Sequence, residues 1–292
     1  MITPWRVAWL RTRSEPAIRP ATPSMPTLEE NRRLWREVYA WQDGGDEWSA
    51  AWGGPEFQWA VTVLPRIQRF LPAGLVVEIG CGFGRWTRFL KDHCERLVAV
   101  DLSDRCIEAC RKRFAADPGM RFVLTDGTTL GQVAAGSVDL VFSFDSLVHA
   151  DCAVLEAYLE EIAAVLKPEG AAFIHHSNVG EYREALDGIR SVQGLEAELQ
   201  RLGCWDDSLH LRDPGPSARW LARTAQTKGL RCITQELVPW GLGRLFIDAF
   251  STLVRADSSH PRHNQVIHND AFVQEIEHAS RLARWYGKDR KD

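Results

Sequence analysis

The stretch LVVEIGCGFGRWTR, residues 75–88, decides the fold of this 292-residue chain. Its first half is apolar and rich in β-branched residues, which is typical of a buried strand. Gly80, Gly82 and Gly84 then alternate with other residues before an amphipathic segment begins. Glycine lets the chain turn tightly and lets a ligand approach the backbone with no Cβ in the way. The order of strand, glycine loop and helix therefore predicts a binding site for a small-molecule cofactor.

Further apolar runs follow this stretch at regular intervals. They are RLVAVDLS (96–103), MRFVLTDG (120–127), VDLVFSFD (138–145), GAAFIHHSN (170–178), LRCITQELVPW (230–240) and RLFIDAFSTLVR (244–255). Helical or loop segments separate the first runs, which indicates a parallel sheet covered on both faces. Only a short glycine-containing turn separates the last two runs, which predicts an antiparallel hairpin.

The chain divides into four segments by composition. Residues 1–26 are rich in proline and arginine and are expected to be a flexible arm. The other segments are a helical and aromatic cap (27–73), a main domain (74–255) with a helical insert at about 177–217, and a C-terminal loop and helix (256–292). The cap begins at Thr27 and Glu30, which have the spacing of a capping box.

Composition excludes several classes of protein. Hydrophobic residues make up 45% and charged residues 25%, which is ordinary for a soluble globular chain. The formal net charge of -4 gives no basic surface for nucleic acid. No apolar run approaches the roughly 18 residues of a membrane span, so a cytoplasmic protein is expected. The seven cysteines form no CxxC pair, which disfavours a disulfide framework or a cysteine metal site.

The glycine loop departs from the dinucleotide fingerprint, because Arg85 stands where the last glycine would fall. Asp101 ends the next strand, where a carboxylate can accept hydrogen bonds from both hydroxyls of a ribose. Together, Glu78, the three glycines, Asp101, the T-D-G at 125–127 and the final hairpin resemble the class I S-adenosylmethionine-dependent methyltransferases. The resemblance covers about residues 74–255. It implies an α/β, Rossmann-like, seven-stranded sheet that is mostly parallel, with a C-terminal antiparallel hairpin and helices on both faces.

The resemblance also implies roles for individual residues toward S-adenosylmethionine, whose product is S-adenosylhomocysteine. Glu78 would lie near the ammonium of the methionine end, and Asp101 would bind the ribose. Asp126 would accept a hydrogen bond from the adenine amino group. The remaining cofactor contacts would be Gly80, Gly82, Gly84, Leu102, Gly127 and Phe144.

Candidate catalytic residues follow the fourth strand of the main domain. If a helical turn starts after Asp145, then His149 lies four residues further on the same face. His149 could take a proton from an acceptor hydroxyl as general base, and Asp145 could orient it or the acceptor. The alternative is that His149 packs or caps a helix start. His175 and His176 should point to opposite faces of their strand, so only one of them would reach the acceptor.

A divalent metal is a further possibility, held by His176 with Asp145 or His149, although oxygen-rich sites suit magnesium better. The segments FDSLVHAD and FIHHSNVGEY are similar to methyltransferases of glycan and secondary-metabolite pathways, which modify sugar hydroxyls. The candidate acceptor contacts are His176, Tyr182, Trp52, His210 and Arg212.

Three functions remain open from the sequence. The first is O-methylation of a saccharide or glycosylated metabolite, and the second is N- or O-methylation of a different small molecule. The third is a scaffold that binds S-adenosylmethionine without catalysis. A nucleic-acid acceptor is disfavoured because the N/D-P-P-Y/F signature is absent after the fourth strand. Either a monomer or a homodimer is compatible with the sequence.

Overall fold

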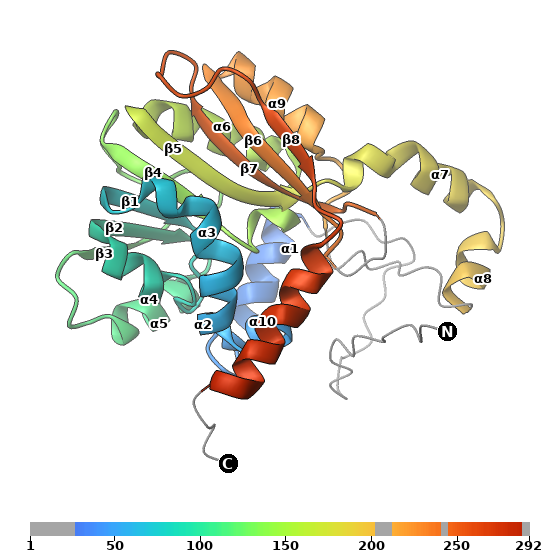
Figure 1. Cartoon of the computed structure of the whole chain (residues 1–292), viewed down its shortest axis with the longest axis horizontal. Coiled ribbons are helices and arrows are strands. Elements are labelled where there is room, and N and C mark those ends of the chain that lie inside the picture. Colours follow the sequence, from blue (N-terminus) through green and yellow to red (C-terminus); the bar gives the residue numbers. More distant parts are fainter. Residues whose placement is uncertain (1–26, 202–211, 241–244, 288–292) are drawn as a thin grey trace.

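An eight-stranded sheet forms the centre of the protein, described by a computed structural model over residues 27–201, 212–240 and 245–287 (Figure 1). The strand order is β3-β2-β1-β4-β5-β7-β6-β8. The strands are β1 (Ala73–Ile79), β2 (Cys94–Asp101), β3 (Met120–Leu124), β4 (Val138–Ser143), β5 (Leu166–Ser177), β6 (Leu230–Val238), β7 (Asp248–Arg255) and β8 (Gln265–His268).

The pairing confirms a mostly parallel sheet with an antiparallel β6–β7 pair. β7 runs antiparallel to both β5 and β6, and the first five strands pair in parallel. The expected number of seven strands was wrong, because β8 adds an eighth strand parallel to β6. All four residues of β8 are exposed, so no buried apolar face marks this strand in the sequence.

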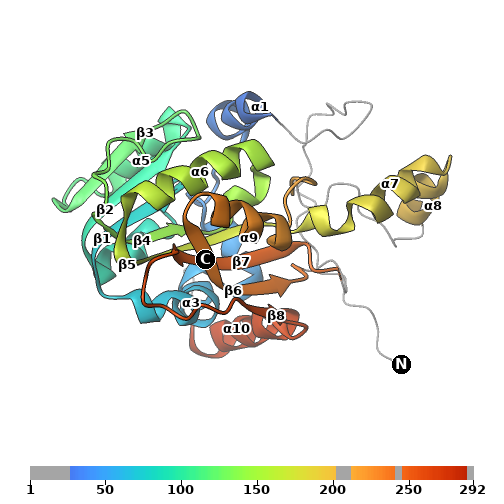
Figure 2. The same ribbon diagram turned by 90° about the horizontal axis from the view of Figure 1, so that it is seen from above.

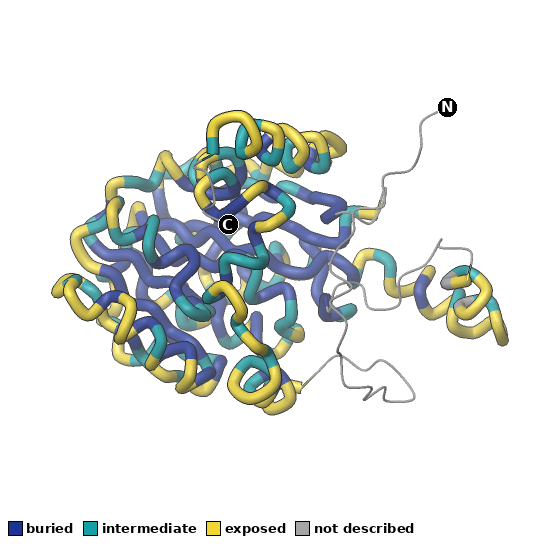
Figure 3. Tube along the Cα trace, turned by 90° about the horizontal axis from the view of Figure 1, so that it is seen from below, coloured by how far each residue is buried: buried dark blue, intermediate teal, exposed yellow. Residues whose placement is uncertain are grey.

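Helices cover both faces of the sheet (Figure 2). α6 (Cys152–Val165) and α9 (Ala218–Thr227) pack with one set of strand side chains, and each begins at a side-chain cap, Asp151 and Ser217. The other face carries the remaining core helices. These are α2 (Pro55–Gln58), α3 (Leu64–Ile67), α4 (Thr87–Leu90), α5 (Asp104–Arg113) and α10 (Phe272–Tyr286). Figure 3 shows the strands as the buried centre between these two layers.

The N-terminal cap begins with α1 (Leu28–Arg33). Thr27 and Glu30 form the predicted capping box, in which the Thr27 hydroxyl accepts from the Glu30 amide at 3.2 Å. A π-helical turn, η1 (Leu34–Val38), and a 3-10 helix, η2 (Asp46–Trp52), follow. The helix expected near residues 56–70 is present as a continuous helical run that includes a π-helical turn at Trp59–Val63.

The described part of the expected insert contains a 3-10 helix, Val179–Tyr182, followed by α7 (Arg183–Ser191) and α8 (Leu195–Arg201). α7 and α8 extend away from the sheet in both views (Figures 1 and 2). The expected flexible arm, residues 1–26, lies outside the described residues. Among the helices that the structure describes, none combines the length and the apolar character needed to span a bilayer.

Candidate active site

The glycine loop after β1 has the left-handed backbone that its sequence predicts. The φ angles of Gly80, Gly82 and Gly84 are 71°, 54° and 86°, which favour glycine. A Cβ at Gly80 would also collide with the side chain of Ser146 in the loop after β4. The loop is tied to β2, since the Gly80 amide donates to the Val100 carbonyl at 2.8 Å. It therefore holds an open backbone against the ends of β2 and β4.

Asp101 lies beside this loop at the end of β2. Its carboxylate accepts from the Gly82 amide and from the Ser103 amide, each at 2.9 Å. Burial raises the pKa of Asp101, and the hydrogen bonds from Ser103 and Gly82 oppose that rise. The carboxylate is thus fixed next to the glycine backbone, where the prediction places the ribose.

Glu78 is buried within β1, with 1% of its surface exposed. Its carboxyl accepts from the Thr87 hydroxyl at 2.5 Å. Burial raises its pKa to about 8, and the Thr87 hydrogen bond only partly offsets this. A buried carboxyl of this kind gains most from a cationic partner, because ionisation without one is unfavourable. An ammonium group at this position therefore fits the local chemistry.

Asp126 and Gly127 follow β3. Asp126 is exposed, and its Oδ1 accepts from the Thr128 amide and hydroxyl, both at 2.9 Å. Gly127 has a φ of 92°, and a Cβ there would lie 3.5 Å from the Cβ of Leu102. Leu102 and Gly127 thus face each other across the ends of β2 and β3, where adenine is predicted. One Asp126 oxygen closes its own turn, so the adenine amino group would donate to the other oxygen.

Asp145 follows β4 with a φ of 61°, a strained conformation for a residue other than glycine. Its carboxylate pairs with Arg85 of the glycine loop at 3.0 Å, and Arg212 lies 3.9 Å away. Both arginines are buried, at 8% and 4% exposed. Phe144 is also buried, with its ring 5.4 Å from that of Trp86. The end of β4 is thus joined to the glycine loop by an ion pair.

His175, Arg212 and Asp248 complete a buried network at this edge. His175 Nδ1 accepts from the Asp145 amide at 3.1 Å, and its Nε2 lies 3.0 Å from an oxygen of Asp248. Arg212 donates to both oxygens of Asp248, at 3.0 and 2.8 Å. Burial alone would raise the pKa of Asp248, but Arg212 and His175 hold it well below its ordinary value. The network keeps Asp248 ionised and fixes the backbone of Asp145.

The sequence did not single out Asp248, and His175 was only one of two alternatives. The antiparallel register places Asp248 at the start of β7, opposite Ser177 at the end of β5. One signal for this role was present in the sequence, because Asp248 is a charged residue within the apolar run of residues 244–255. Arg212 was predicted as an acceptor contact, and the structure places it in this network beneath the Trp240 ring, 5.3 Å from its centroid.

His149 lies at the end of a 3-10 turn, Leu147–His149, and not on a continuous α-helix with Asp145. Its ring lies 5.6 Å from that of Trp35, between ring centroids. Asp145 instead faces Arg85. The predicted shared helical face is therefore absent, while the role of His149 as a base stays a prediction.

His176 is completely buried, and both of its ring nitrogens have partners. Nδ1 lies 2.8 Å from the Ser177 carbonyl, and Nε2 lies 2.8 Å from the Ser251 hydroxyl. Burial lowers the pKa of His176 to about 4. His175 and His176 do point to opposite faces of β5. This arrangement favours His175, not His176, as the histidine that lies beside Asp145 at the carboxyl edge of the sheet.

The other predicted acceptor contacts are dispersed. Trp52 is fully buried and donates through Nε1 to the Thr62 hydroxyl at 2.9 Å, so it packs in the core. The Tyr182 hydroxyl accepts from the Phe246 amide at 3.0 Å. His210 lies outside the described residues. No group of three or more potential metal ligands occurs within residues 27–201, 212–240 and 245–287.

The segment of residues 28–48 covers the loops that follow β1, β2, β3 and β4. Trp41 stacks on Phe83 of the glycine loop, with ring centroids 4.5 Å apart and planes 8° apart. A Cβ at Gly82 would lie 2.9 Å from the Trp41 ring. Leu28 lies over Gly127 after β3, and Trp35 lies against His149 after β4. We call Trp35, Tyr39, Trp41 and Trp48, whose rings pack together, the aromatic cap.

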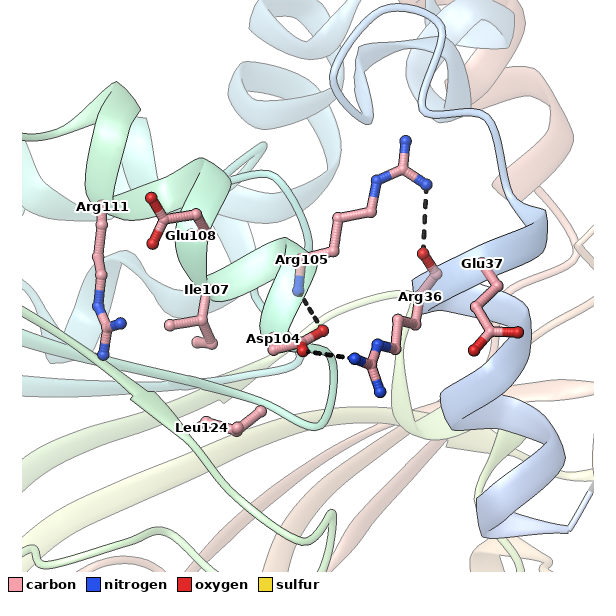
Figure 4. A pocket seen from close by; sticks show the side chains of 8 residues that line it. All are labelled: Arg36, Glu37, Asp104, Arg105, Ile107, Glu108, Arg111 and Leu124. Atoms are coloured by element: carbon pink, nitrogen blue, oxygen red, sulfur yellow. Dashed lines mark hydrogen bonds and ion pairs between the residues drawn. The ribbon is translucent and has the colours of Figure 1, made fainter.

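A cleft of about 520 Å³ lies along the seam between this segment and α5 (Figure 4). Arg36 pairs with Asp104 across the seam at 3.0 Å. Arg105 donates to the carbonyl oxygens of Arg36 and Tyr39, at 3.4 and 3.0 Å. These contacts fasten the aromatic cap to the start of α5, outside the glycine loop.

Comparison with known proteins agrees with this geometry. Residues 76–170 match the model of a methyltransferase domain family. The matched segment contains the glycine loop, Asp101 and the end of β4. The match supports the interpretation of this segment as part of a class I S-adenosylmethionine-dependent methyltransferase.

Individual relatives match over part of their length. The malonyl-[acyl-carrier protein] O-methyltransferase of Serratia marcescens is 28% identical over 42% of this chain and 46% of its own. The human thiol S-methyltransferase TMT1A is 33% identical over 38% of this chain and 47% of its own. The chain thus spans about half the length of these curated relatives. The crystal structure of the PH0226 protein from Pyrococcus horikoshii OT3 shares the fold, with a TM-score of 0.51, 18% identity, and coverage of 76% of this chain and 95% of that one.

Proposed function

We propose that this protein transfers a methyl group from S-adenosylmethionine to a hydroxyl of a saccharide or glycosylated metabolite, with His149 as general base. The observation that carries the proposal is the contact between Asp101 and the amide of Gly82. This contact holds a carboxylate that could bind a ribose next to the glycine backbone, at the carboxyl edge of a parallel sheet. Open α/β folds bind their ligands at this edge.

The residues present fit the cofactor. Glu78 offers a buried carboxyl for the ammonium group, and Asp101 offers a carboxylate for the ribose. Leu102 and Gly127 would flank the adenine, with Asp126 at its amino group. Gly80, Gly82, Gly84 and Phe144 would border the methionine end. When bound, S-adenosylmethionine supplies an electrophilic methyl group on a sulfonium.

The residues after β4 would act on the acceptor. When the acceptor takes the methyl group that the bound cofactor would supply, the imidazole of His149 would accept the proton of the acceptor hydroxyl. Asp145 would align the acceptor, since its backbone is fixed by His175 and its carboxylate by Arg85. The aromatic cap lies over these loops and would exclude water from them.

A second candidate is N- or O-methylation of a small molecule that is not a sugar. The names of the two relatives give malonyl-[acyl-carrier protein] and a thiol as methyl acceptors, and neither of these is a sugar. Because Trp35 of the aromatic cap lies against His149, the acceptor would meet an aromatic surface, which suits the C–H face of a sugar ring and also an aromatic acceptor. A divalent metal would be an addition to this mechanism and not a requirement of it, and the protein would act as a monomer or a homodimer.

Labelled methyl transfer into fractionated saccharide and small-molecule extracts would test the proposal, with and without a chelator. The variants are His149→Ala and, as the matched control, His263→Ala, an exposed histidine in the loop before β8. We expect label in a saccharide fraction with wild type and His263→Ala, and a loss of about 10²-fold or more with His149→Ala. Binding of S-adenosylhomocysteine should persist in all three proteins.

Three results would contradict parts of this proposal. Label that appears only in an amine, thiol or protein fraction would overturn the saccharide acceptor. Equal label with wild type and His149→Ala would overturn the general base. A loss of transfer with the chelator would establish the metal requirement, and no binding of either cofactor form would overturn the methyltransferase itself.

A further inference from the structure

Two thiols meet beneath the glycine loop. Cys81 lies within the loop and Cys110 lies on α5, and their Sγ atoms are 3.9 Å apart. Both are buried, at 4% and 0% exposed. Cys110 Sγ also donates to the Gly82 carbonyl at 3.2 Å, and a Cβ at Gly84 would lie 3.4 Å from the same sulfur. The second thiol therefore packs directly against the backbone that would hold the cofactor.

We propose that Cys81 and Cys110 are a redox modification site, oxidised by a peroxide to a disulfide that closes the glycine loop to S-adenosylmethionine. The site itself is independent of methyl transfer, and its effect on binding rests on the proposed function. A disulfide has an S–S distance of about 2.05 Å, so the two sulfurs must approach each other by about 2 Å. The new bond turns the Cys110 sulfur toward Cys81 and removes the thiol donor from the Gly82 carbonyl, which changes how α5 supports the loop.

The oxidation balances with hydrogen peroxide as the oxidant. The Cys81 thiolate attacks one peroxide oxygen, an S–O bond forms, the O–O bond breaks, and hydroxide leaves to give a sulfenic acid. The Cys110 sulfur then attacks the sulfenic sulfur, an S–S bond forms, and water leaves. In total the two thiols lose two electrons and two protons, and the peroxide is reduced to two molecules of water. A thiol reductant reverses the reaction.

The surroundings make this site slow to oxidise. The contact with Cys110 and the burial of the loop raise the pKa of Cys81, and the negative charges of Asp101 and Glu78 raise it further. Only a small fraction is therefore thiolate at neutral pH, and the cross-link should form faster as the pH rises. Trp41 lies over Gly82 and limits access to the loop from outside.

Cys106 provides a matched control on the same helix. It lies one turn before Cys110, is 1% exposed, and its burial likewise raises its thiol pKa. Cys106 and Cys110 also share one tryptic peptide, residues 106–111, whereas Cys81 lies in the peptide 70–85. A linked pair of peptides alone would not identify the second cysteine, so the variants Cys106→Ser and Cys110→Ser are needed.

The test exposes the reduced full-length chain to hydrogen peroxide, blocks the remaining thiols and maps the peptides without reduction. We expect the linked peptides in wild type and Cys106→Ser, and none in Cys110→Ser. Calorimetry with S-adenosylhomocysteine should show at least a tenfold loss of affinity on oxidation of the first two proteins, restored by dithiothreitol. Each variant is compared with its own reduced form, and Cys110→Ser should change less than twofold.

Three outcomes would count against the proposal or its basis. A link through Cys106, or over-oxidation of Cys81 without any link, would overturn the site. A Cys81–Cys110 link that leaves the affinity unchanged would overturn its control of the loop. If the reduced protein does not bind S-adenosylhomocysteine, the proposed function fails, while the peptide map still decides whether the disulfide forms.

Discussion

The ends of β1 and β5 lie on the same edge of one sheet, yet their polar groups come from the chain in different ways. Near β1, Glu78, the three glycines and Asp101 all lie within residues 78–101. Near β5, the network joins Asp145, His175, Arg212 and Asp248, which span more than 100 residues of sequence. The first region is shaped by backbone geometry that glycine permits. The second is held by buried charges that tertiary packing brings together.

The two regions should therefore fail in different ways when a single residue is changed. A substitution in the glycine loop should remove ligand binding in addition to part of the stability, because the loop would hold the ligand through its backbone. A substitution in the buried network should mainly affect folding, because it removes one member of a buried, hydrogen-bonded ion pair. The predictions below test this difference, beginning with the network.

Asp248→Asn should cause the largest loss of stability. Arg212 would lose its bidentate partner at full burial, and His175 would lose the carboxylate beside Nε2. Breaking a buried ion pair from one side destabilises a protein by about 3–5 kcal/mol. Urea unfolding of the variant should show a loss of that size.

The matched control is Glu181→Gln, which breaks an exposed ion pair with Arg219. Its effect should stay within about 1 kcal/mol, because solvent screens the pair. Equal losses of unfolding free energy in the two variants would show that the buried network does not stabilise the protein more than an exposed ion pair does.

The same contrast explains what the sequence could predict. The parallel strands, the antiparallel β6–β7 pair and the glycine loop were predictable because apolar runs and glycine spacing are local signals. Strand β8 was not, because four exposed residues that pair through the backbone carry no such pattern. Asp101 beside the glycine loop followed from its place at the end of a strand. Asp248 joins the site through the register of β5 with β7, which no local pattern specifies.

The histidines show the same limit at single residues. Alternation in β5 predicted that His175 and His176 point in opposite directions, and it could not say which one faces the catalytic edge. The distinction comes from Asp145 and Asp248, which contact His175, and from Ser251, which contacts His176. These partners lie on other strands or loops.

Gly80→Ala should remove cofactor binding and destabilise the fold. Left-handed backbone costs an alanine about 1–2 kcal/mol, and the collision with Ser146 adds about 1–3 kcal/mol. Thermal unfolding and calorimetry with S-adenosylhomocysteine would measure the two effects. Gly136→Ala is the control, since its φ is 62° and no heavy atom lies within 4 Å of the added Cβ. It should show only the backbone cost and normal binding, and a similar loss of binding in both variants would contradict a specific role for the loop.

Glu78→Gln should abolish a proton release that accompanies cofactor binding. Burial raises the pKa of Glu78 from 4.5 to about 8, so the free protein holds this proton at neutral pH. An ammonium group favours the carboxylate and expels the proton, so binding should strengthen as the pH rises toward about 8. Calorimetry of S-adenosylhomocysteine in buffers of different ionisation enthalpy measures the release directly.

The same group sets a pH dependence of stability in the free protein. The folded state keeps the Glu78 proton between 4.5 and about 8, while the unfolded chain has lost it, so stability should fall as the pH rises through this window. Glu78→Gln should flatten that fall. If wild type and variant show the same slope and the same proton release, Glu78 does not face the ammonium.

Trp41→Ala should give the smallest effect and the most specific one. Trp41 packs on Phe83 and over Gly82, so its loss should open the aromatic cap above the glycine loop while the core stays intact. Release of S-adenosylhomocysteine, followed by stopped-flow fluorescence, should become several-fold faster, with a change of less than about 2 kcal/mol in unfolding free energy. Trp285→Ala is the control, because Trp285 is 68% exposed on α10 and should leave the release rate unchanged. An unchanged release rate in Trp41→Ala would mean that the cofactor leaves by a path that the aromatic cap does not cover. The loops after β1 and β4 would then exchange ligand independently of the aromatic cap.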